Sequence, residues 1–292
     1  MRPGKSSGEV RRREHIWTIV LAAVFIVGLL ILLFPTVSSW WNARVQRRAV
    51  AAYEEAAAEL SEAASAEFFE AAGAHNESLA GIGSAEAIAC PERVEEEYEA
   101  LPDISGTGVL GYVSIAKIDV QLPIYYGTDD AVLQVGAGHL EGSSLPVGGE
   151  STHSVILAHR GLPGSLLFTN LDELELGDTF TVTVLDRVLT YRVDRISVVL
   201  PDELENLYIE EGKDYCTLMT CTPYGINSHR LLVRGVRVGN TEEAVMRVTT
   251  DAGEMELLTV ALLIAAPLLL LVLIWLLWSA RRKKKREADH EK

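Results

Sequence analysis

The sequence predicts a mainly β domain, a mostly antiparallel barrel or sandwich, that lies between two membrane-spanning helices. Three observations predict this class. Short β-rich runs separated by turn residues fill the chain after Gly106. A stretch rich in Ala, Glu and Arg precedes them, and a long apolar segment without charge lies towards each end.

The first apolar segment, residues 16–34, has 19 residues without a charge, which meets the length of about 20 residues that a bilayer helix needs. A cleaved signal peptide is the alternative. Its apolar region is usually only about 7–15 residues long and ends at a small-residue cleavage site. The sequence Phe-Pro-Thr at 34–36 is not such a site, so we expect an uncleaved signal anchor.

The second apolar segment, residues 257–278, has 22 residues and is followed by six basic residues at 281–286. This layout also occurs in cell-wall sorting signals, which need an LPxTG-like pentapeptide just upstream. The sequence at 249–253 is Thr-Thr-Asp-Ala-Gly, which does not match. We therefore expect a permanent second membrane helix.

Charge predicts the orientation of the chain. Residues 1–15 carry +3 and residues 279–292 carry +4, so both tails are expected on the cytoplasmic side. Of the total of −15, this leaves −22 for the part between the tails. An acidic extracytoplasmic domain is a poor candidate for binding nucleic acid, which needs a basic face.

Between the first span and the β-rich region, residues 39–70 have apolar positions at helical spacing, which predicts a membrane-proximal helix. Residues 71–88 turn to Gly, Ser, His and Asn and are predicted as a loop. A short helix is expected at 92–101. The predicted strands are 109–118, 120–125, 153–157, 179–185, 188–199, 215–221 and 231–238.

The three cysteines are Cys90, Cys216 and Cys221, an odd number for an extracytoplasmic protein, so at least one is expected as a free thiol. Cys216 and Cys221 lie on one predicted strand, about 16 Å apart, which is too far for a disulfide. Their odd spacing points them to opposite faces of the strand. Cys216 is therefore predicted to pack in the core.

Cys221 is the candidate nucleophile. It ends the apolar run 217–221, and Arg230 begins the next run after a loop that contains Pro223 and Gly225. If the two runs pair as antiparallel neighbours, the thiol and the guanidinium lie at the same sheet edge, where a cation favours the nucleophilic thiolate. The alternative is a buried structural cysteine.

His159 is the candidate proton carrier, because it follows the strand-like run 154–158 and thus lies at a strand end, like Cys221. A thiol nucleophile needs such a group to protonate the leaving amine. Of the other histidines, His229 lies beside Arg230, and His139 and His153 are expected to satisfy nearby backbone groups.

Together these runs resemble the sortase family, specifically the class C, pilin-polymerising type. The resemblance covers residues 104–240. It rests on Thr-Leu-Met-Thr-Cys at 217–221 with Thr-Pro-Tyr at 222–224, His-Arg-Leu-Leu-Val-Arg-Gly at 229–235, Leu-Pro-Ile-Tyr at 122–125, Gly-His-Leu-Glu-Gly-Ser-Ser-Leu-Pro at 138–146 and Ala-His-Arg-Gly-Leu-Pro at 158–163.

The resemblance implies an eight-stranded sortase β-barrel, with Cys221 as nucleophile, His159 as acid and base, and Arg230 as stabiliser of the substrate carbonyl or oxyanion. It implies cleavage of an LPxTG-like signal through a thioester, and transfer of the acyl group to a lysine amine of a pilin subunit. No metal or organic cofactor is implied. The alternatives are attachment of surface proteins to peptidoglycan, a module that binds sorting signals without catalysis, and a hydrolytic thiol protease.

Class C sortases carry a lid with an Asp-Pro-aromatic tripeptide before the barrel. Here the nearest match is Cys90-Pro91 followed by Glu92, so both the acid and the ring are replaced. We hypothesise that Cys90 closes on Cys221 as a reversible disulfide. The alternative is that Cys90 is an exposed or packed residue in a degenerate lid.

These predictions place the protein in the cell membrane, with two helices, an extracytoplasmic catalytic domain and both termini in the cytoplasm. The predicted segments are a cytoplasmic tail at 1–15, a membrane helix at 16–34, a helical and lid segment at 35–103, the catalytic barrel at 104–240, a linker at 241–256, a membrane helix at 257–278 and a basic cytoplasmic tail at 279–292.

Overall fold

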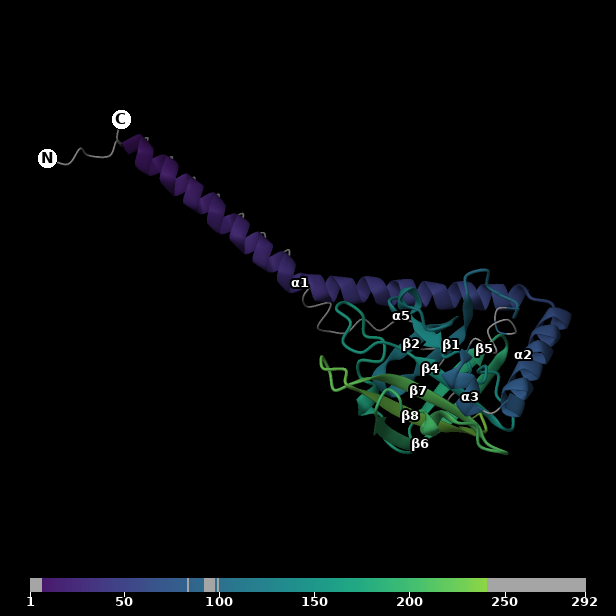
Figure 1. The fold of residues 1–292 in the computed structure, drawn as a ribbon. Coiled ribbons are helices and arrows are strands. Elements are labelled where there is room, and N and C mark those ends of the chain that lie inside the picture. Colours follow the sequence, from purple (N-terminus) through teal and green to yellow (C-terminus); the bar gives the residue numbers. More distant parts are fainter. Residues whose placement is uncertain (1–6, 83, 92–97, 99, 241–292) are drawn as a thin grey trace. The chain divides into compact units, whose positions relative to one another are not determined.

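The computed structural model describes residues 7–82, 84–91, 98 and 100–240 of the chain (Figure 1). The chain divides into two units, of which the first contains residues 1–37 and 252–292. The second unit, residues 38–251, contains the β-barrel and the helices packed on it.

Helix α1, Ser7–Glu59, contains the predicted span 16–34 and continues through Pro35 into the second unit. Within the described residues it is the one helix long and apolar enough to cross a membrane, over Ala23–Glu59. The helical character predicted for 16–34 is confirmed. The second predicted span, 257–278, lies outside the described residues.

The predicted helix 39–70 is interrupted, because α1 ends at Glu59 and α2, Glu62–Ile82, begins after a short break. The loop predicted at 71–88 is wrong: α2 runs through most of it, and the short helix α3, Ser84–Ala89, follows. Of the helix predicted at 92–101, residues 92–97 and 99 lie outside the described part of the chain.

The barrel explains why α2 has so many polar residues. Phe68, Ala72, Asn76 and Leu79 form one buried stripe along the helix. The Asn76 side chain donates to Leu145 O at 3.2 Å, and Leu145 N donates to Asn76 Oδ1 at 2.7 Å. Asn76 is therefore polar because it satisfies buried backbone groups of another segment. In the sequence such a residue looks the same as a polar loop residue.

Eight strands close into a barrel in the order β1-β2-β3-β4-β7-β8-β6-β5. Six of the eight neighbouring pairs are antiparallel, and β2–β3 and β4–β7 are parallel. The predicted mostly antiparallel barrel is thus confirmed. The strands are β1 Val109–Ile115, β2 Val120–Tyr126, β3 Ala137–His139, β4 Thr152–Leu157, β5 Thr179–Val184, β6 Arg187–Val199, β7 Asp214–Thr222 and β8 His229–Val238.

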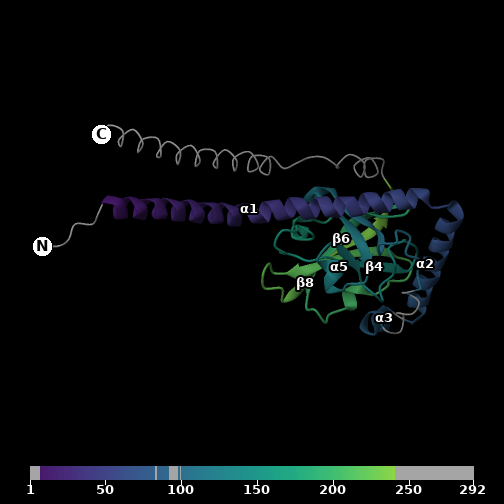
Figure 2. The same cartoon turned by 90° about the horizontal axis from the view of Figure 1, so that it is seen from above.

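The second half of α1 lies along the barrel and α2 flanks another side of it (Figures 1 and 2). Tyr53 of α1 donates its hydroxyl to Leu110 O at 2.9 Å and accepts from Leu185 N at 2.9 Å, so it joins β1 to the turn after β5. Gln46 donates to Val135 O at 3.1 Å. These bonds hold the membrane-proximal helix to the barrel that carries the site.

Candidate active site

The β7–β8 hairpin places Cys221 opposite Arg230, as its antiparallel register pairs these two residues directly. Both side chains are half-buried. The loop between the strands begins just after Cys221, so thiol and guanidinium are at the end of the barrel where this loop emerges. The pairing predicted from the sequence is confirmed.

His159 reaches the same end of the barrel by way of β4. The parallel register of β4 and β7 pairs Leu157 with Met219, and His159 and Cys221 each follow two residues later. Ala158 N donates to Met219 O at 3.2 Å, which extends the ladder past Leu157. The structure thus brings Cys221 of β7, Arg230 of β8 and His159, two residues after β4, to one end of the barrel.

Strand periodicity determines which cysteine reaches the surface. Cys216 is fully buried in the barrel core together with Leu218, whereas Met219 belongs to a separate cluster of buried residues. Cys221 lies two residues after Met219 and so shares its face. Burial raises the pKa of the Cys216 thiol well above its usual range, and its predicted packing role is confirmed.

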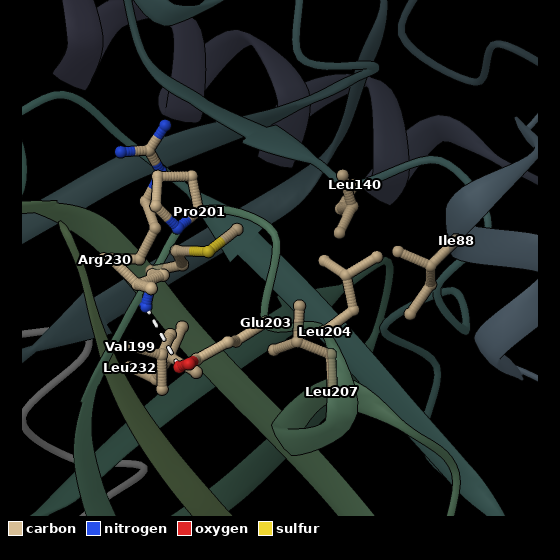
Figure 3. Close-up of a pocket in the computed structure, with 11 residues that line it drawn as sticks. Ile88, Leu140, Val199, Pro201, Glu203, Leu204, Leu207, Arg230 and Leu232 are labelled. Carbon is tan, nitrogen blue, oxygen red and sulfur yellow. Dashed lines mark hydrogen bonds between the residues drawn. The ribbon is translucent and has the colours of Figure 1, made fainter. Parts of the chain in front are cut away.

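A pocket of about 190 Å³ lies on this face (Figure 3). Arg230 lies at one end and Ile88 of α3 at the other, with Leu204 and Leu207 between them. The lining is apolar apart from Arg230 and Glu203. The lining residues are Ile88, Leu140, Val199, Leu200, Pro201, Glu203, Leu204, Leu207, Met219, Arg230 and Leu232.

The segment between β6 and β7 forms one wall of this pocket. Glu203 turns back and accepts from Leu200 N at 3.1 Å, the bond drawn in Figure 3. The η4 turn, Glu205–Leu207, follows and buries Leu207 against Met219 and Leu232. The pocket therefore has a structured apolar wall that a hydrophobic side chain can fill.

The lid candidates lie directly after α3. Cys90 is exposed, and Pro91 is half-buried. Ile88, two residues before Cys90, lines the pocket. The main chain of Ala87 contacts Gly142, whose φ of +79° and lack of a Cβ allow this close approach. All three cysteines are free thiols in this structure.

His139 is a structural residue, as predicted. Its ring lies between the Tyr98 hydroxyl, 3.0 Å from Nδ1, and Ser144 O, 2.9 Å from Nε2. Because Gly127 N donates to the tyrosine oxygen, the hydroxyl is free to donate to Nδ1. Burial lowers the pKa of His139 to about 4, so its ring is neutral.

His153 is also structural. Its Nδ1 lies 3.0 Å from Tyr208 O and its Nε2 lies 2.7 Å from the Thr217 hydroxyl. Burial lowers the pKa of His153 to about 4. The two buried histidines satisfy backbone groups, whereas His159 and His229 both lie at the end of the barrel that carries Cys221, with His229 paired to Thr222.

Two residues that the sequence analysis left without a role hold the segment around His159. Thr220 donates its hydroxyl to Ala158 O at 2.8 Å, and Arg160 contacts Thr222 and Asp172. Thr220 and Arg160 could have been found from the sequence, because they are the direct neighbours of Cys221 and His159. The contact between Arg160 and Asp172 could not, because it depends on how the chain folds after β4.

Gly161 allows the loop after His159 to pack closely against Tyr224 of the β7–β8 loop. Its φ is +73°, and a Cβ there would lie 2.8 Å from the ring of Tyr224. Among the residues that the structure describes, no three His, Cys, Asp or Glu side chains are grouped to hold a metal ion.

Residues 113–238 match the sortase domain family. The structure is similar to the crystal structure of sortase C1 from Streptococcus agalactiae, with 47% identity, a TM-score of 0.62, and coverage of 66% of this chain and 100% of that chain. This chain belongs to the sortase family.

Sortase C-1 from Streptococcus pneumoniae is 43% identical, with a TM-score of 0.57, and the match covers 66% of this chain and 100% of that one. Because both neighbours are C1 sortases, the resemblance to class C is confirmed. Sortase A from Streptococcus agalactiae serotype III (strain NEM316) is 32% identical over 117 residues, which is 39% of this chain. This chain spans about half the length of that curated relative.

Proposed function

We propose that this sortase is a membrane-anchored cysteine transpeptidase that cleaves LPxTG-like sorting signals and joins the acyl group to a lysine amine of a pilin subunit. The observation that carries the proposal is the register of three neighbouring strands, which brings Cys221, His159 and Arg230 to one edge of the barrel. Sortases are cysteine transpeptidases, and the structural neighbours are of the C1 type.

In the first half-reaction the Cys221 thiolate attacks the threonine carbonyl carbon of the signal, and a C–S bond forms. Arg230 stabilises the oxyanion, because its guanidinium keeps its charge at physiological pH and presents several donors. His159 protonates the glycine nitrogen as the C–N bond breaks. The products are a thioester on Cys221 and a peptide with a free amine.

In the second half-reaction the lysine amine attacks the thioester carbonyl, His159 accepts the amine proton, and the C–S bond breaks. An isopeptide bond forms, and the Cys221 thiolate and protonated His159 of the starting state are regenerated. The apolar pocket beside Arg230 suits the leucine and proline side chains of the signal. No step requires a metal or an organic cofactor.

The barrel is assigned to the outside of the membrane and both termini to the cytoplasm. The support is the apolar segment of α1 together with the net basic tails. In this arrangement the enzyme meets surface proteins as they leave the membrane.

The test is a product assay with the full chain in detergent. An LPxTG-type peptide is supplied with a lysine-containing pilin fragment, with a peptidoglycan peptide amine, or with no acceptor, beside Cys221→Ala. An isopeptide product with the pilin lysine supports the proposal. Transfer to the peptidoglycan amine alone would instead indicate surface-protein attachment, and binding without cleavage would indicate a non-catalytic module.

A further inference from the structure

Arg160 lies next to His159 in the chain and is almost buried, with 10% of its side chain exposed. Its Nη1 donates to the Thr222 hydroxyl at 3.3 Å, and its Nη2 forms an ion pair with Asp172 at 2.5 Å. Thr222 is the last residue of β7 and follows Cys221 directly. The guanidinium therefore connects the segment that carries His159 with the segment that carries Cys221.

This link lies just beyond the regular sheet. The printed β4–β7 register ends at Leu157 and Met219, and the bond from Ala158 N to Met219 O continues it by one step. His159 and Cys221 follow on the two emerging chain segments. Beyond the last backbone hydrogen bond, the Arg160–Thr222 hydrogen bond joins these two segments.

The energetics of Arg160 do not favour a role in stability alone. Burying a guanidinium beside one carboxylate recovers little net free energy, and 49% of the Asp172 side chain is exposed. The Arg160 Nε is also buried without a hydrogen-bond partner within the described residues. A buried donor without a partner is energetically unfavourable. A group kept at this cost points to a role in geometry.

We propose that Arg160 is a positioning residue that sets His159 against Cys221 by bridging Thr222 and Asp172. The inference rests on the proposed function, because it assumes that His159 and Cys221 react together. Arginine suits the role since its planar fork presents donors in fixed, divergent directions, whereas lysine offers one point charge.

The test compares steady-state kinetics of the full chain for Arg160→Gln, Arg160→Lys and Asp172→Asn with an LPxTG-type peptide. Because a misplacement of about 1 Å costs about 10²-fold in rate, Arg160→Gln is expected to lower kcat about 10- to 100-fold. KM should stay within about twofold, since Arg160 does not line the pocket. Arg160→Lys and Asp172→Asn should give intermediate kcat values.

Arg234→Gln is the matched control. Arg234 is similarly buried, with 14% of its side chain exposed, and pairs with Asp194 and Glu210, away from the segment that carries His159. The Arg234→Gln variant is expected to lower the free energy of unfolding without lowering kcat. An equal loss of kcat in Arg234→Gln and Arg160→Gln, or a rise in KM in place of the fall in kcat, would overturn the positioning role.

Two further readouts separate the possible failures. If circular dichroism shows that Arg160→Gln is unfolded, the inference is tested by Arg160→Lys and Asp172→Asn instead. A wild-type kcat in both of these variants would overturn it. Cys221→Ala and His159→Ala test the proposed function itself. Turnover that persists in either one refutes that function whatever Arg160 does.

Discussion

At the scale of single residues, two threonines of β7 support different histidines. Thr220 donates to Ala158 O, directly before His159, while the Thr217 hydroxyl lies against the buried ring of His153. Both side chains are buried. Replacing either by valine removes one hydrogen bond and keeps the shape, so the pair forms a matched comparison.

We expect Thr220→Val and Thr217→Val each to lower the free energy of unfolding by about 1–3 kcal/mol, because each leaves a buried acceptor without its donor. Only Thr220→Val should lower kcat, since only that bond positions the residue before His159. Denaturant unfolding and steady-state kinetics check this. Equal kcat in the two variants would show that the Thr220 bond is purely structural.

The buried histidines make stability depend on pH. The pKa of His153 is about 4 in the folded state, against an ordinary value near 6.5, so the unfolded chain binds the extra proton between these values. Stability should therefore fall as the pH drops from about 6.5 to about 4, by about 1.4 kcal/mol per unit for each such histidine.

His153→Gln keeps hydrogen-bonding capacity without the titration and should flatten this dependence, as measured by thermal unfolding across that pH range. The wild type, measured in parallel over the same pH range, is the reference. If His153→Gln also retains the full wild-type slope, the assignment of the neutral buried ring is wrong.

The residue-scale chemistry was partly predictable. The pairing of Cys221 with Arg230 depends on a local hairpin whose two strands are close in sequence, so run length and turn residues were enough to predict it. His159 was recognisable from its place at a strand end. Asp172 was not, because its contact with Arg160 forms only when the loop after β4 folds back.

At the scale of elements, the seven strands other than β3 were predicted to within three residues at each end, whereas β3 was not predicted. It has three residues including Gly138, too short to show alternation. The helix α2 was missed in part because its buried stripe contains Asn76 and His75. Its apolar periodicity is broken by the polar groups that bond the barrel or pack against it.

The segment after α3 bears on the proposed redox gate. Ile88 lines the pocket beside Arg230, and Cys90 follows two residues later as an exposed thiol. The hypothesis is that Cys90 and Cys221 form a disulfide. A disulfide oxidant such as oxidised glutathione would accept the two electrons and leave as two thiols.

We expect oxidised glutathione to convert the wild type into an inactive form that is lighter by two hydrogens and carries no glutathione, by intact mass. Dithiothreitol should restore activity. Cys90→Ser should stay unbridged under the same treatment, with Cys221 either free or bound to glutathione. Alkylation of both Cys90 and Cys221 under all redox conditions would exclude the gate, and the degenerate lid would then be the better interpretation.

At the scale of the whole molecule, charge and hydrophobicity predict how the protein lies in the membrane. The tails carry +3 and +4, and the remainder carries −22. A basic tail directly precedes the first predicted span and another directly follows the second. The fold class was predictable at this scale because strands, turns and spans each have a composition of their own, whereas strand order depends on distant pairings.

Cysteine labelling tests this topology. In a Cys90→Ser, Cys221→Ala background, Ser6→Cys and Ser279→Cys should react with a membrane-impermeant maleimide only after the cells are permeabilised. In a variant with only Cys221 replaced, the exposed thiol of native Cys90 should react in intact cells, because the proposed topology places the barrel and Cys90 outside the membrane. Labelling of either tail in intact cells would contradict the assignment of both termini to the cytoplasm.

The central claim is that Cys221 forms a covalent thioester with the sorting signal, and intact-mass spectrometry of the full chain with an LPxTG-type peptide tests it most directly. We expect an adduct that maps to Cys221, is released by hydroxylamine and is absent from Cys221→Ala. A reduced wild-type protein that binds the peptide but forms no adduct, or an adduct that persists in Cys221→Ala, would contradict the account.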